Sequence, residues 1–119
     1  MSDLDRIYQT QKIIDFNKST ATGNTAELIA AQGAGKYIKV MSFTIVCTAA
    51  STVQFKSASD AITQAMSFAA NGGESKQYSP LGHMRTAANE ALNWTIGGTG
   101  PALIYGTAVV VTNPSQGTI

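Results

Sequence analysis

Apolar and polar residues alternate along several short stretches of this chain, and a period of two is typical of strands with one buried face. Leu92, Trp94 and Ile96 alternate with polar residues, and the stretch 103–112 is rich in β-branched and aromatic residues. Between them, the glycines and the proline of residues 97–101 favour a connection. The sequence therefore predicts two strands here, either as an antiparallel pair or as a crossing between two sheets.

The same pattern predicts eight strand-like segments along the chain and no long amphipathic helix. The clearest strand is 36–47, whose apolar residues fall on both faces, with Phe43 and Ile45 on one face and Ile38 and Val40 on the other. Residues 60–70 fit both periods, so we expect one helical turn followed by a strand. The remaining expected strands are 12–16, 26–32, 52–56, 74–78, 90–96 and 103–112.

Many short strands separated by turns rich in glycine, serine and asparagine are typical of a β-sandwich. We therefore expect an all-β, single-domain antiparallel β-sandwich of the jelly-roll type, with about eight strands and an extended N-terminal arm. Residues 1–18 would form the arm and a first short strand, 19–112 the sandwich, and 113–119 a loose tail. The predicted core residues are Phe43, Ile45, Phe55, Leu92, Trp94 and Ile96.

Charged residues make up 13% of the 119 residues and the net charge is +1. Such a weak charge leaves little repulsion against copies of the chain or against another protein. The basic residues are dispersed, which argues against nucleic acid. The apolar stretches are far shorter than the ~20 residues that span a bilayer, so we expect no membrane partner. A polar N-terminus and a single cysteine, Cys47, lead us to expect a reducing compartment.

Residues with catalytic potential are few and scattered. The lone histidine, His83, has no nucleophile motif beside it, so we interpret it as a loop or interface residue. Residues 33–36 lack the earlier glycine and the following hydroxyl residue of a phosphate-binding loop. The acidic residues are dispersed, and Cys47 fits a small buried side chain. We therefore predict no catalytic residue, no metal, no cofactor and no small-molecule substrate.

The order of these features resembles that of small capsid decoration or cement proteins of tailed phages, which have a jelly-roll fold. The resemblance covers roughly residues 26–112, and it rests on the segments 36–47, 52–57, 81–86, 89–93 and 103–107. It implies a non-enzymatic virion protein, made in the host cytoplasm, that sits on the outer capsid surface. Its partners would be the major capsid protein, whose neighbouring subunits it bridges, and itself, as a dimer or trimer.

Contacts to the capsid or to other subunits are expected from the arm and from the loop around the histidine. The candidate contact residues are Ile7, Tyr8, Ile13, Ile14, Phe16, His83, Met84 and Arg85. Two other functions stay open. One is a carbohydrate- or receptor-binding module of a phage tail, in which Trp94 or Tyr105 stacks on a sugar, although the pattern favours a core position for both. The other is a small sandwich enzyme such as a glycan hydrolase, for which Glu90 and His83 would be tested.

Overall fold

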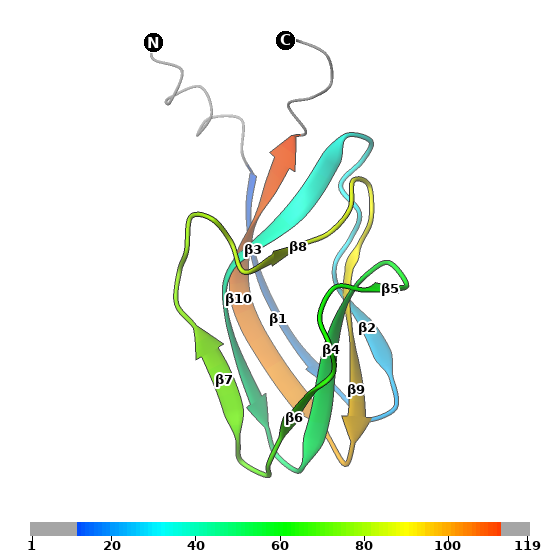
Figure 1. The fold of residues 1–119 in the computed structure, drawn as a ribbon, viewed down its shortest axis with the longest axis vertical. Coiled ribbons are helices and arrows are strands. Elements are labelled where there is room, and N and C mark those ends of the chain that lie inside the picture. Colours follow the sequence, from blue (N-terminus) through cyan, green and yellow to red (C-terminus); the bar gives the residue numbers. More distant parts are fainter. Residues whose placement is uncertain (1–11, 113–119) are drawn as a thin grey trace.

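The structure, a computed structural model, describes residues 12–112 as two antiparallel sheets that pack face to face (Figure 1). All ten regular elements in this range are strands. The larger sheet has the order β1 (Lys12–Thr20), β10 (Ala102–Thr112), β3 (Lys36–Cys47) and β7 (Gly73–Lys76), and β8 (Met84–Arg85) also pairs with β3. The second sheet has the order β2 (Thr25–Ile29), β9 (Leu92–Gly98), β4 (Ser51–Ser57) and β5 (Asp60–Ala61), and β6 (Met66–Phe68) also pairs with β4.

The predicted all-β antiparallel sandwich is confirmed at this level of detail. The bounds expected for 36–47 agree with those of β3. The helical turn expected within 60–70 is wrong, because this stretch forms β5 and β6 instead. Both strands pair with β4, and the amide of Ile62 donates a hydrogen bond to the carbonyl of Phe55 at 2.9 Å. Pairing with the sheet satisfies backbone groups that a single helical turn would leave without partners.

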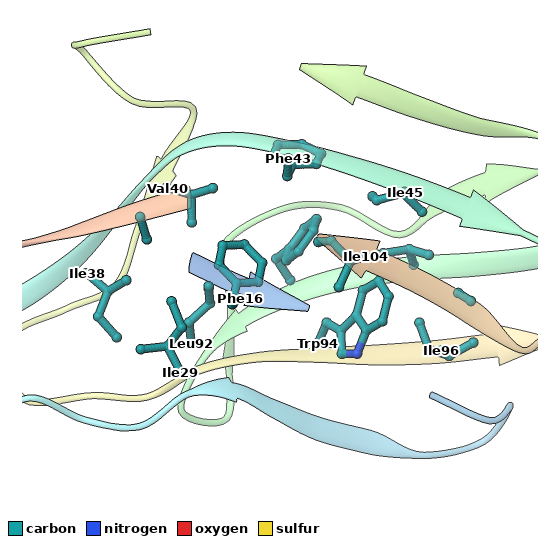
Figure 2. Packing of buried hydrophobic residues seen from close by; sticks show 14 of the residues in the cluster. Phe16, Ile29, Ile38, Val40, Phe43, Ile45, Leu92, Trp94, Ile96 and Ile104 are labelled. Carbon is teal, nitrogen blue, oxygen red and sulfur yellow. The ribbon is translucent and has the colours of Figure 1, made fainter. Parts of the chain in front are cut away.

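Buried side chains from both sheets meet in one core (Figure 2). All six residues that the alternating pattern placed in the core are buried there. Phe55 lies between two other aromatic rings, with its centroid 5.5 Å from that of Phe43 and 6.1 Å from that of Trp94. The buried indole N–H of Trp94 donates a hydrogen bond to Thr20 Oγ1 at 2.9 Å. The two sheets are therefore joined by aromatic packing and by one buried polar contact.

The strand β3 contains a bulge, which explains why its buried residues are even-numbered in its first part and odd-numbered in its second part. Its register with β10 shifts between Thr107, which faces Ser42, and Ala108, which faces Val40, so that Met41 is an extra residue. Such a bulge changes the parity of the residues that follow it. Ile38 and Val40, which precede the bulge, are therefore buried in the same core as the odd-numbered residues that follow it. This arrangement corrects the expectation of two separate apolar faces.

The first strand belongs to the sandwich along its whole length. β1 pairs with β10 from Lys12 to Thr20, so the boundary expected after residue 18 falls inside a strand. Phe16, expected as a contact residue, is only 6% exposed and packs in the core (Figure 2). Its alternation with Asp15 and Asn17 on the opposite face turns its ring inward. Residues 1–11, with the candidates Ile7 and Tyr8, and residues 113–119 lie outside the described residues.

Candidate docking surface

After β7, the chain follows the edge of β3 that pairs with both β7 and β8 (Figure 1), and we call residues 77–85, which include β8, the strap. The amide of Ser79 donates a hydrogen bond to the carbonyl of Met41 at 3.0 Å, and the amide of His83 donates one to that of Val40 at 2.8 Å. A turn inside the strap is closed by the amide of Gly82, which donates to the carbonyl of Ser79 at 2.9 Å. The strap is therefore fixed to the sheet by backbone hydrogen bonds at several points.

The side chain of His83 makes two contacts that hold the strap in place. Its Nε2 lies 2.7 Å from the carbonyl oxygen of Gln77, which accepts a hydrogen bond from the ring. The ring also meets Phe43 edge to face, with the centroids 5.9 Å apart. The expectation of His83 as a loop residue agrees with this placement. Because the ring is held by both contacts, it supports the strap against the rim of the core.

The outer side of the strap combines apolar and cationic side chains. Leu81 is 87% exposed and Tyr78 is 67% exposed. The Arg85 guanidinium lies 5.2 Å from the ring centroid of Tyr37, a cation–π distance. A hollow of about 290 Å³ lies between these elements, bounded by Tyr37, Lys39, Leu81, Gly82, His83, Met84 and Arg85. We call Tyr37, Lys39, Tyr78, Leu81, His83 and Arg85 together the strap surface.

Strand pairing brings one residue of the expected arm to the same part of the sheet. Ile13 pairs with Val109, Val109 pairs with Lys39, and Lys39 pairs with Arg85. Directly paired residues share one face of a sheet, so Ile13, which is 72% exposed, lies in a row with the cations of the strap surface. The structure thus brings together candidates that are far apart in the sequence.

The other candidate contacts have different surroundings. Ile14 and Met84 are half-buried and pack against the core, so they lie on the inner side of the sheet and not on the strap surface. The candidates from the sequence did not include Tyr37, Lys39, Tyr78 and Leu81. A signal was present for Leu81, an isolated apolar residue between a proline and a glycine. No such signal was available for Tyr37, because its face depends on the bulge at Met41.

The two aromatic residues considered for sugar stacking have opposite environments. Trp94 is fully buried, as the pattern favoured, and cannot stack on a ligand. Tyr105 was also expected in the core, but it is 61% exposed on the outer face of β10. This expectation is corrected because Tyr105 alternates with the buried residues Ala102 and Ile104, and the alternation turns its ring outward.

The remaining reactive side chains are engaged in the fold. Glu90 Oε1 accepts a hydrogen bond from Ser57 Oγ at 2.5 Å, and Ser57 Oγ accepts one from the amide of Ala87 at 2.9 Å. Burial raises the pKa of the Cys47 thiol, and a hydrogen bond with Ser51 opposes this shift to a smaller degree. Within residues 12–112 there is no group of three or more residues suited to hold a metal ion, and no helix is long and apolar enough to cross a membrane.

Comparisons with known proteins give matches only among solved structures. No family model matches the sequence, and no curated protein does. Among solved structures, the fold is similar to a chain from a study titled "Bacillus endospore appendages form a novel family of disulfide-linked pili". That match has a TM-score of 0.48 and 14% sequence identity, and it covers 87% of each chain.

Proposed function

We propose that this protein is a non-enzymatic structural protein of a phage virion with a jelly-roll sandwich. It sits on the outer capsid surface and cements the shell by bridging neighbouring major capsid protein subunits. The observation that carries the proposal is the strap surface, where exposed apolar side chains stand on a loop fixed to the sheet. The proposed place of synthesis is the host cytoplasm.

The strap surface has the properties of a preorganised docking site. Binding by a mobile loop loses part of its free energy to the ordering of that loop, whereas backbone hydrogen bonds already fix the strap to β3. Tyrosine and arginine are enriched among the residues that dominate binding energy, and both are present here in Tyr78 and Arg85. Leu81 is the most exposed large apolar side chain among the described residues and supplies an anchor for a pocket of the partner.

The charges favour an acidic patch on the capsid subunit as the counterpart. Lys39 and Arg85 stand side by side in the paired row, so a carboxylate of the partner would find two cations within one surface. The net charge of +1 opposes close placement of several copies only weakly. A dimer or trimer at a symmetry axis would then engage several subunits at once, and weak contacts would add through effective concentration.

Capsids assembled without this protein provide the test. Purified protein should bind expanded capsids that lack it and should slow their disruption by heat or by a chelator. Leu81→Asp should weaken this binding by at least about tenfold, because it places a charge at the anchor position. Ala65→Asp, which adds the same charge at an exposed position next to β6, is the control and should bind as the unchanged protein does. Absence of binding at saturating concentration, or equal loss in both variants, would refute the proposal.

A further inference from the structure

The outer face of the larger sheet carries a second feature, at the part of the sheet beyond the strap surface. Tyr105 on β10 pairs with Asn17 on β1 and with Thr44 on β3. The neighbouring row of the same face pairs Thr107 with Asp15 and with Ser42. One exposed aromatic ring therefore lies in a block of polar side chains drawn from three adjacent strands.

This block is hollowed on both sides of the tyrosine. One hollow, of about 310 Å³, is bounded by both rows and by Lys76 of β7. A second hollow, of about 350 Å³, is bounded by Tyr105, Leu103, Val46 and the neighbouring residues of β1. Tyr105, Asn17 and Thr44 border both hollows. The ring thus lies between a hollow of mixed polarity and a more apolar one.

The polar side chains of the block are already oriented. Thr107 Oγ1 donates a hydrogen bond to Asp15 Oδ1 at 2.9 Å, which holds the carboxylate in place beside the hollow. The hydroxyl groups of Thr44 and Ser75 lie 2.9 Å apart, within hydrogen-bond distance. A carboxylate and a hydroxyl group accept more than one hydrogen bond, so these contacts leave capacity for a ligand. The block therefore offers acceptors and donors in fixed positions.

The charge around the hollow is close to balanced. The ammonium group of Lys76 is paired with the carboxylate of Glu74 at 2.9 Å, Asp15 supplies one negative charge beside the first hollow, and Lys18 supplies one positive charge beside the second. A ligand that carries phosphate requires clustered Lys and Arg, which this hollow does not provide. The surroundings suit a neutral ligand that has several hydroxyl groups and one apolar face.

We propose that the two hollows beside Tyr105 together bind a neutral saccharide built of pyranose rings. The C–H face of a sugar ring would lie on the electron-rich face of Tyr105. Its hydroxyl groups would reach Asp15, Asn17 and Thr44, and the next ring would cover Leu103 and Val46. The site shares no residue with the strap surface, so this proposal and the proposed capsid attachment can fail independently.

Titration of the labelled protein with three tetrasaccharides, followed by NMR, tests the proposal. The probes are tetrasaccharides of β-1,4-linked N-acetylglucosamine, β-1,4-linked glucose and α-1,4-linked glucose. They distinguish an N-acetylated amino sugar from glucans, and one glucan linkage from the other. At least one should shift the amide signals of Asn17, Thr44 and Tyr105. Tyr105→Ala should weaken that binding by about tenfold or more, whereas Tyr105→Phe should retain it, because the ring provides the stacking.

Tyr78→Ala is the matched control, because Tyr78 is a similarly exposed tyrosine on the strap, and it should leave sugar binding unchanged. If Tyr105→Ala fails to fold, Asn17→Ala on the edge strand provides the second variant and should also weaken binding. The proposal is overturned if none of the three sugars shifts these signals, or if binding survives both substitutions at the hollow. Equal weakening by Tyr78→Ala would likewise overturn it.

Discussion

Trp94 and Tyr105 illustrate, at the scale of single residues, what a local pattern can predict. The alternation around Trp94 correctly indicated a buried ring, because both of its apolar neighbours share its face. It could not indicate the hydrogen-bond partner, Thr20, which lies 74 residues away in the sequence. For Tyr105, the neighbours Ile104 and Gly106 gave no clear parity, so only the structure shows that its ring points outward.

The contact between Trp94 and Thr20 leads to a prediction about stability. Thr20→Val keeps the shape and the branching of the side chain but removes the acceptor of the buried indole N–H. We expect a loss of about 1 to 3 kcal/mol in the free energy of unfolding, since a buried donor would lose its partner. Urea unfolding measures this change. Thr25→Val removes the exposed contact to the hydroxyl of Thr95 at 2.7 Å and should cost less than about 0.5 kcal/mol. Equal losses of stability in the two variants would contradict a special role of the buried hydrogen bond from the indole.

At the scale of an element, β3 separates what was predictable from what was not. Its extent follows from a long run of β-branched and aromatic residues. Its orientation does not, because a run with apolar residues of both parities permits either face to be buried. The bulge at Met41 resolves this by burying even positions before it and odd positions after it. A bulge depends on pairing with β10, more than fifty residues later in the sequence, so no local pattern reveals it.

Deleting one residue of β3 tests this interpretation. Without Met41, the inward residues Val40 and Phe43 would be two positions apart, and regular alternation would keep every buried residue inside. We therefore expect the variant that lacks Met41 to unfold cooperatively, at lower stability because a buried side chain and the bend are lost. Deleting Thr44 instead would turn Ile45 and Cys47 outward, and we expect no cooperative transition. Circular dichroism during thermal unfolding distinguishes the two. If both variants unfolded in the same way, the bulge would not determine which residues of β3 face the core.

At the scale of the whole molecule, the arrangement of strands creates the proposed sites. In the larger sheet, β3 lies between β10 and the strands β7 and β8, and this order was not predicted from the sequence. Ile13, Lys39 and Arg85 become neighbours only through this order, and so do the residues around Tyr105. The fold class follows from local alternation, whereas both candidate surfaces depend on pairings between distant segments.

The pH dependence of unfolding is a property of the whole molecule to which Cys47 contributes. The thiol is fully buried, and burial raises its pKa above the ordinary value of 9.0. Above that value the unfolded chain releases the thiol proton while the folded protein retains it, so ionisation favours the unfolded state. Stability is therefore complete below the unfolded pKa and falls as the pH rises toward the folded pKa. The slope from this residue reaches at most about 1.4 kcal/mol for each pH unit.

Cys47→Ala isolates this contribution, because it removes the thiol and leaves the other titrating groups in place. Urea unfolding of both proteins between about pH 7 and pH 10.5 should show a stability difference that is constant below the ordinary thiol pKa. Above it, the stability of the unchanged protein should fall more steeply than that of the variant, and the two curves should converge. Parallel curves over the whole range would mean that the thiol ionises equally readily in both states. That result would contradict its burial between the two sheets.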